Sequence, residues 1–275
     1  MSVEYAITAP NRASRTRVRA AAILLGAAML GACSSGVDVA GLSGVERAFA
    51  DRKPIAFSSP TPQSFPVHGV DVAKYQGTID WPRLRASGVS FAFIKATEGG
   101  DRLDKRFSEN WRGAKAAGVP RGAYHFHYWC RSAAEQAAWF IQNVPRERGA
   151  LPPVLDVEWN GHSPTCPIRL PASKARAEMT TFLRIIEDHY GQRPIIYSTV
   201  DFHRDVMRGH FGGYDHWLRS TKDHVRDTYP TRAGEWTFWQ YTATGRAPGV
   251  DADLDLNAFR GGERAWRAWV RKRAR

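Results

Sequence analysis

The chain has 275 residues, of which 43% are hydrophobic and 12% aromatic, so it can bury a substantial core and is not a disordered sequence. Its formal net charge of +12 favours an anionic partner such as nucleic acid, a lipid surface or a cell-wall polymer. The sequence contains no zinc finger, no helix-turn-helix signal and no basic stripe interleaved with aromatic residues, so we expect no nucleic-acid binding.

The first 32 residues have the pattern of an export signal. An arginine-rich lead precedes an apolar run from Ala20 to Ala32, which is too short for a comfortable membrane span. The run ends in Leu30-Gly31-Ala32-Cys33, which resembles the lipobox of bacterial lipoproteins, where the cysteine is lipidated and begins the mature chain. We therefore expect residues 1–32 to be a signal peptide and Cys33 to carry a lipid. A signal peptide cut elsewhere is the alternative.

Residues 33–66 are rich in serine, glycine, proline and small side chains, as in Ser58-Ser59-Pro60-Thr61-Pro62. This composition predicts a flexible tether between the membrane and a folded domain of residues 67–275. After residue 67 the chain changes character, because short apolar runs alternate with longer segments of helical period.

The short apolar runs predict eight strands. The alternation of strands with helical segments indicates a parallel sheet wrapped by helices. The predicted strands are Gly69–Ala73, Phe91–Thr97, Gly122–His127, Val154–Glu158, Ile195–Ser198, His216–Arg219, Thr237–Tyr241 and Asp253–Leu256.

Helical segments separate the early strands and become short or vanish after Ser198. Their boundaries carry ordinary start and stop signals, namely Asp80-Trp81-Pro82, Gly118 after Phe107–Ala117, the capping box Ser132–Glu135 before Gln136–Val144, and Gly191 after Lys174–Tyr190. Two later helices are expected at Asp201–His210 and Glu263–Arg271. This distribution favours an α/β fold, an irregular TIM-like barrel of eight strands with full helices mainly in its first half, over an open sheet.

Asp156 and Glu158 end an apolar run and are separated by one residue. A strand points alternate side chains to the same face, so the two carboxyl groups would lie close together. Such a pair commonly has one raised pKa and one carboxylate that stays charged, which suits proton transfer and stabilisation of a cation. For an isolated Asp-x-Glu sequence, a capped strand end is the more common explanation.

Further polar residues follow the other predicted strands, and in such a barrel the carboxyl ends of the strands form the active site. They are Asp71, Glu98, Tyr124 with His125, Tyr197, Arg219, Gln240 with Tyr241, and Asp255. Carboxylates surrounded by tyrosine and tryptophan suggest a sugar polymer as substrate. The chain contains no Gly-x-Ser-x-Gly elbow, phosphate-binding loop or His-Glu-x-x-His motif, so we expect neither a metal nor a cofactor.

Apart from Cys33, the chain contains two cysteines, Cys130 and Cys166. Both follow the end of a predicted strand, so they could meet in neighbouring loops of an exported protein and form a disulfide. Free buried thiols are the alternative, and two cysteines without a matching histidine cluster make a poor metal site.

Five blocks in order give the sequence a resemblance to the family 25 glycoside hydrolases, lysozymes that act as N-acetylmuramidases on peptidoglycan. The similarity extends from about Val67 to Phe259. The blocks are His68-Gly69-Val70-Asp71-Val72-Ala73-Lys74-Tyr75-Gln76-Gly77, Phe93-Ile94-Lys95-Ala96-Thr97-Glu98-Gly99, Gly122-Ala123-Tyr124-His125-Phe126, Asp156-Val157-Glu158, and Trp239-Gln240-Tyr241 with Asp255-Leu256-Asn257.

The resemblance implies an irregular eight-stranded barrel and hydrolysis of the β-1,4 bond from N-acetylmuramic acid to N-acetylglucosamine, with retained configuration. It makes Glu158 the general acid and base. It makes Asp156 the residue that orients the 2-acetamido group of the substrate in a substrate-assisted reaction, with a covalent carboxylate nucleophile as the other route. Asp71 and Asp255 match the remaining acids of the family's cluster.

The resemblance also places Tyr124 and Tyr197 near the reacting sugar. Glu98, Trp217, Arg219 and Gln240 are further candidates that either line the groove or support the barrel. The sequence departs from the family pattern at Ala73 and in the loops with Cys130 and Cys166; this affects subsite specificity, and a disulfide there would staple the loops beside Glu158.

The leading hypothesis is thus a lipid-anchored, monomeric muramidase on the periplasmic face of the cell envelope, on the outer rather than the inner membrane. A peptidoglycan-binding lipoprotein of the same fold without activity is the second hypothesis, and it predicts loss of one of the four acids, all of which are present. A chitinase-like barrel is the third, and it expects a longer run of aspartates where Val154 and Leu155 stand.

Overall fold

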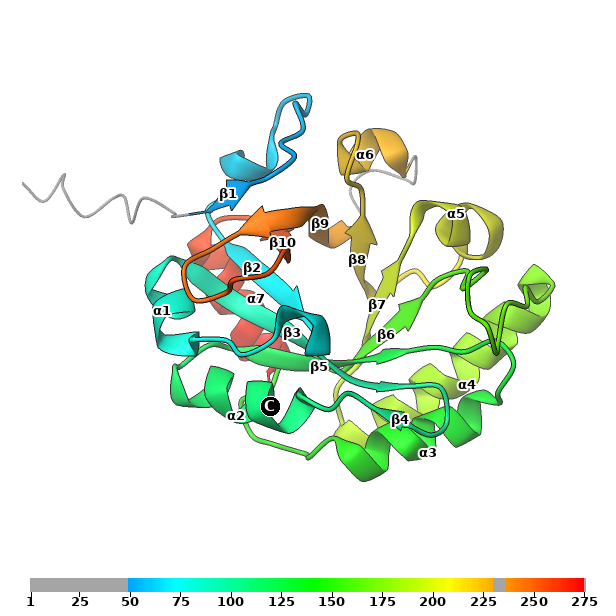
Figure 1. Ribbon diagram of the computed structural model, residues 1–275. Helices are drawn as coiled ribbons and strands as arrows, with labels where there is room; N and C mark the ends of the chain where they lie inside the picture. The colour runs from blue at the N-terminus through cyan, green and yellow to red at the C-terminus, as the bar shows by residue number, and fades with distance from the viewer. Residues whose placement is uncertain (1–48, 230–235, 275) are drawn as a thin grey trace, which may run out of the picture. The chain divides into compact units, whose positions relative to one another are not determined.

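Eight strands close into a barrel in the part of the chain that the computed structural model describes, residues 49–229 and 236–274 (Figure 1). These residues belong to one unit that spans residues 43–275. Each strand lies at its predicted place, β7 with the predicted bounds and the others with shifted ends, and the predicted barrel is confirmed. Around the barrel the strands are β2 (His68–Val72), β3 (Val89–Glu98), β5 (Arg121–Phe126), β6 (Val154–Val157), β7 (Ile195–Ser198), β8 (Asp215–Arg219), β9 (Trp236–Arg246) and β10 (Leu254–Phe259).

Strands β2 to β9 of the barrel run parallel, and β10 runs antiparallel to both of its neighbours, β9 and β2. The expectation of a parallel sheet was therefore wrong for the last strand. A parallel connection needs a crossover of about a dozen residues or more, and the loop 247–253 between β9 and β10 is too short for one. As a result, the beginning of β10 lies beside the end of β2.

Full helices cover the first half of the barrel, as predicted. Asp80 caps the first helix by accepting a hydrogen bond from the backbone of Arg83, and Ser132 caps the third through Glu135. Gly191 ends the fourth with a positive φ of 65°. These helices are α1 (Trp81–Ala86), α2 (Phe107–Ala116), α3 (Ala133–Asn143) and α4 (Ala172–Tyr190).

The later helices are shorter than the early ones, except for the last. The predicted helix Asp201–His210 is divided into α5 (Val200–Phe202) and a π-helical segment, His203–Met207. A helix of one turn, α6 (Val225–Thr228), was not predicted. Among the described residues, no helix is long and apolar enough to cross a membrane.

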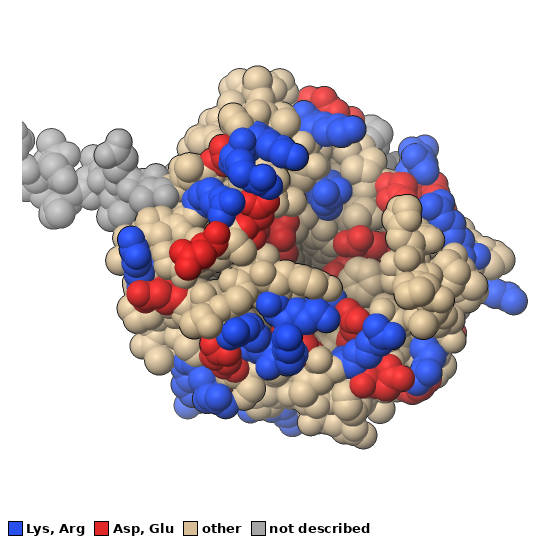
Figure 2. Space-filling view, viewed as in Figure 1, with Lys and Arg blue, Asp and Glu red and all other residues tan. Residues whose placement is uncertain are grey.

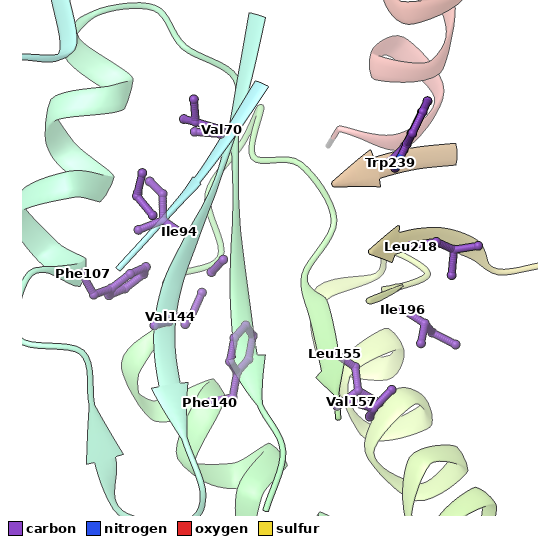
Figure 3. Close-up of a cluster of buried hydrophobic side chains, with 14 of the residues drawn as sticks. Val70, Ile94, Phe107, Phe140, Val144, Leu155, Val157, Ile196, Leu218 and Trp239 are labelled. Atoms are coloured by element: carbon purple, nitrogen blue, oxygen red, sulfur yellow. The ribbon is translucent and has the colours of Figure 1, made fainter. Parts of the chain in front are cut away.

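The strands separate two hydrophobic cores because their side chains alternate in direction. On β3, Phe93 belongs to the cluster inside the barrel, and its neighbour Ile94 packs outward towards the helices. Figure 3 shows the outer core, where Ile94, Phe107 and Phe140 come together from β3, α2 and α3. Aromatic rings fill the inner core, which leaves polar side chains to the mouth of the barrel.

The C-terminal helix α7 (Glu263–Arg273) closes the end of the barrel opposite the carboxyl ends of the parallel strands. The ring of Trp266 lies 5.1 Å from Phe91 and 5.2 Å from Phe259, between ring centroids. Arg273 anchors the helix by donating a hydrogen bond of 2.9 Å to Asp215 at the start of β8. This end of the barrel is thus a packed floor.

Residues 49–66 contact the outside of the barrel, although the sequence assigned residues 33–66 to a tether. Strand β1 (Ala50–Asp51) pairs with β9, and the ring of Phe57 meets Trp239 edge to face at 5.0 Å. Among the described residues, these side chains cover outer faces of the second half of the barrel, where long helices are lacking. Residues 1–48, with the predicted signal peptide and Cys33, lie outside the described residues.

Replacing Trp266 with alanine is expected to lower the free energy of unfolding by about 3–5 kcal/mol, because the change removes the side chain that fills the barrel floor. Arg264→Ala is the control on the same helix, since Arg264 is exposed and should change stability by less than about 0.5 kcal/mol. Urea denaturation measures both variants. Equal losses in the two variants would show that the floor contributes no special stability.

Candidate active site

The four predicted acids meet at the mouth of the barrel. Asp71 lies one residue before the end of β2, Asp156 lies on β6 with Glu158 just after it, and Asp255 lies near the start of β10. Asp255 faces Asp71 directly in the antiparallel pairing of β10 with β2. It therefore joins the cluster from the beginning of a reversed strand and not from a carboxyl end. Figure 2 shows acidic side chains on the walls of a hollow in this face.

Asp71 is held by a network of side-chain hydrogen bonds inside the barrel. Its Oδ2 accepts hydrogen bonds from Gln240 Nε2 at 3.0 Å and from Asn257 Nδ2 at 2.8 Å. The hydroxyl of Tyr197 donates to Gln240 Oε1 at 2.8 Å, and Trp217 Nε1 donates to Asn257 Oδ1 at 2.7 Å. Both amide groups are thereby fixed with their donors towards Asp71.

Burial raises the pKa of Asp71 to about 6, although the two amide donors and the guanidinium group of Arg219 act in the opposite direction. Burial also raises the pKa of Asp255 well above its ordinary value, and the charge of Asp71 adds to this effect. Two facing carboxyl groups with raised pKa values retain protons at a higher pH than exposed acids do. This wall of the site therefore carries less negative charge than its residue types suggest.

The catalytic pair predicted from the sequence is also protonated more easily than ordinary acids. Burial, followed by the charge of Glu158, raises the pKa of Asp156 well above its ordinary value. Burial raises the pKa of Glu158 as well, and Arg219 counteracts the effect. Oδ1 of Asp156 is buried and accepts no hydrogen bond from the described residues, so it is an unsatisfied acceptor inside the site.

The loop after β6 is fixed from the neighbouring loop after β5. Trp129 Nε1 donates a hydrogen bond of 2.7 Å to the backbone carbonyl of Glu158, and the Trp129 ring stacks on Phe202 at 5.0 Å. Cys130 and Cys166 form the predicted disulfide, with their Cα atoms 5.7 Å apart. The contact through Trp129 places the backbone of Glu158, and the disulfide ties the two loops together.

The remaining candidates divide into two groups. Tyr124, Tyr197, Trp217, Arg219 and Gln240 come together around the acids; the tyrosines are buried, and nearby carboxyl groups help to raise their pKa values. Glu98 lies at the edge of the mouth instead. There it contacts Lys95 at 2.5 Å and accepts a hydrogen bond from Tyr128 at 3.3 Å.

Two residues of the site were missed by the sequence prediction. Asn257 stands two residues after Asp255 and Lys95 two residues after Phe93, so the alternation of strand side chains could have placed both on the inner face. The charge of Lys95 opposes part of the rise in the pKa values of both Asp156 and Glu158. Among the described residues, no group of three or more histidines, cysteines, aspartates or glutamates could hold a metal ion.

Comparison with known proteins agrees with this geometry. The model of "Glycosyl hydrolases family 25" matches residues 70–250. "Uncharacterized protein YegX" of Escherichia coli K12 is 36% identical, over 78% of this chain and 77% of its own. "Lysozyme M1" of Streptomyces globisporus is 36% identical, over 71% of this chain and 68% of its own. A family 25 glycosyl hydrolase structure from Bacillus anthracis is 35% identical, with a TM-score of 0.69, and the match covers 80% of this chain and 98% of that one.

We expect Asp71→Asn to stabilise the protein at neutral pH. A pKa of about 6 in the folded state, against the ordinary 3.8, means that the folded protein binds this proton more tightly than the unfolded chain. The contribution of Asp71 to the free energy of unfolding is therefore most favourable below about pH 4. It falls as the pH rises through about 6, by up to about 3 kcal/mol in all. The asparagine variant lacks this loss.

Calorimetry at pH 4 and pH 7.5 measures the effect as the difference in Tm between Asp71→Asn and the wild type. The difference should be larger at pH 7.5, and Asp188→Asn, at an exposed position on α4, should show no such change. A variant that is less stable than the wild type at pH 7.5 contradicts the prediction.

Proposed function

Because the chain belongs to glycosyl hydrolases family 25, we propose that its four acids cleave the β-1,4 bond from N-acetylmuramic acid to N-acetylglucosamine. The protein is a glycoside hydrolase of the lysozyme type, and its substrate is peptidoglycan. The observation that supports the reaction best is the pair of Asp156 and Glu158 at the barrel mouth, both with raised pKa values. Such a pair can hold a proton ready for the glycosidic oxygen.

Glu158 is the general acid and base of this proposal. It is only partly buried and follows the end of β6, so it can reach a substrate in the hollow. Its raised pKa keeps a proton on the carboxyl group at a higher pH than an exposed glutamate allows, and this proton goes to the leaving oxygen. The resulting carboxylate then takes a proton from the attacking water.

Asp156 acts on the 2-acetamido group of the substrate. Its carboxyl group can accept a hydrogen bond from the acetamido N–H and so turn the acetamido oxygen towards the anomeric carbon. That oxygen forms a bond to the anomeric carbon as the glycosidic bond breaks. Water then displaces it from the opposite side, and the two inversions together retain the configuration.

Asp71 and Asp255 shape the charge and hydrogen bonding of the same pocket. The hydroxyl of Tyr197 is engaged by Gln240, so it acts through the fixed network around Asp71. Tyr124 is buried among Asp71, Asp156 and Asp255, and we assign its hydroxyl to the carbonyl oxygen of the acetamido group. Arg219 opposes the rise in the pKa values of Glu158, Asp71 and Asp255.

Glu158→Gln is expected to lower kcat on purified peptidoglycan by about 10²–10⁴-fold, because glutamine cannot supply the proton. Release of new reducing ends measures the rate, and the sugar at those ends must be muramic acid. The control Glu263→Gln changes an exposed residue on α7 and should keep wild-type activity. An active Glu158→Gln, or glucosamine at the new ends, would contradict the mechanism; a wild type that binds peptidoglycan without cutting it would favour the binding-only alternative.

We further propose that the enzyme is a monomer, exported and held by a lipid on Cys33 at the periplasmic face of the envelope, on the outer membrane. The motif Leu30-Gly31-Ala32-Cys33 supports the anchor, and the disulfide is of the kind formed in oxidising compartments.

Cys33→Ala is expected to move the protein from the membrane fraction to the soluble fraction and to abolish a lipid mass on the mature N-terminus. The double variant Cys130→Ala/Cys166→Ala retains Cys33, and its folded fraction should stay with the membrane. A Cys33→Ala protein that remains in the membrane fraction would exclude this anchor.

A further inference from the structure

One edge of the barrel mouth is built from two short segments that touch. The 3₁₀ segment Lys74–Gln76 follows β2 directly, and β4 (Arg102–Leu103) folds back on the end of β3, where Arg102 faces Glu98. The backbone N–H of Lys74 donates a hydrogen bond of 2.9 Å to the side chain of Asp104, just after β4. The two segments therefore form one continuous edge of the mouth.

Positive charge predominates among the exposed side chains of this edge. Lys95, Lys74 and Arg102 all act on Glu98 and contribute to its lowered pKa, so three cations surround one carboxylate. The Arg102 side chain is 52% exposed and that of Glu98 only 17%, so the cation faces solvent. Figure 2 shows basic side chains gathered below the hollow, where Figure 1 draws the segment from β3 to β4.

Nearby acids offset this charge only in part. Arg102 lies 3.6 Å from Glu98, but the same carboxylate also contacts Lys95 at 2.5 Å. Asp104 is buried, and its carboxylate accepts hydrogen bonds from the backbone of Lys74 and Arg106. Asp101 lies 3.6 Å from the guanidinium group of Arg131. Lys74 is exposed beside the mouth, and Arg102 shares Glu98 with Lys95, so this edge keeps an excess of positive charge.

The same edge also exposes apolar surface. Tyr75 is 70% exposed and Leu103 is 50% exposed, the highest values among the large hydrophobic side chains of the described residues. Tyr75 stands next to Lys74, and Leu103 stands next to Arg102. Exposed apolar side chains that alternate with cations suit a ligand with both aliphatic groups and carboxylates.

We propose that Lys74, Tyr75, Arg102 and Leu103, named here the cationic rim, bind the carboxylate-bearing peptide stems of peptidoglycan. The inference rests on the proposed function. A muramic acid residue bound next to Glu158 carries its peptide on the lactyl group, and the stem leaves the hollow at its edge. The acidic pocket acts on the uncharged sugar bond, and the cationic rim selects glycan strands by the charge of their stems.

The test compares two substrates that differ only in charge, namely soluble glycan strands with intact stems and the same strands with stem carboxylates converted to carboxamides. The wild type should have a kcat/KM about fivefold to tenfold higher on the charged strands, mainly through KM. Lys74→Gln/Arg102→Gln should reduce this preference to less than about twofold, because it removes the two exposed cations of the rim. The wild-type preference itself is modest because each exposed ion pair contributes only modestly. Arg102→Lys preserves the charge and should preserve most of the preference.

Arg264→Gln removes an exposed charge on the barrel floor and is the matched control, which should keep the wild-type preference. A wild type without preference, or a double variant with the wild-type preference, overturns the inference. Glycan strands whose stems have been removed by an amidase distinguish a failure of this inference from a failure of the proposed function. If the wild type releases muramic acid ends from them, the proposed function stands whatever the rim does; if it cuts none of the three substrates, the proposed function itself fails.

Discussion

The hydrogen-bonded burial of Asp71 is the constraint on which the rest of the site depends. One carboxylate oxygen receives two side-chain amides, and these amides are fixed in turn by Tyr197 and Trp217. The network joins β2, β7, β8, β9 and β10, which is more than half of the barrel wall. A buried carboxyl group without such partners would be strongly destabilising. The network therefore fixes the end of β10 that carries Asp255, and it includes β7, which pairs directly with β6, the strand of Asp156.

Segments outside the regular helix layer hold this barrel in shape. Helix α7 inserts Trp266 into the floor, β1 and Phe57 cover β9, and the Cys130–Cys166 disulfide ties the loops beside Glu158. On β9, in the second half of the barrel, β1 and Phe57 provide packing of the kind that long helices provide in the first half.

The pocket and the edge of the mouth differ in charge, because four acids line the pocket and cations gather at the edge. Inside, burial raises the pKa values of all four acids, and the charges of neighbouring acids add to this effect for Asp156, Glu158 and Asp255. Raised pKa values favour proton transfer to an uncharged sugar. At the edge, cations surround Glu98 and lower its pKa. Lys95 belongs to both regions. It contacts Glu98, and its charge opposes part of the rise in the pKa values of Asp156 and Glu158. In our proposal the glycosidic bond is cleaved in the pocket, and the cationic rim recognises the glycan strand through its peptide stems.

The sequence by itself determined the strands, the helix caps and the identities of the four acids that meet at the mouth, because these depend on local periodicity and on motifs within a few residues. Tertiary structure alone decided the direction of β10, the position of residues 49–66 on the barrel, and the partners of Asp71. Gln240 and Asn257 stand 169 and 186 residues from Asp71 in the chain. No local pattern encodes such contacts, because only closure of the barrel brings these strands together.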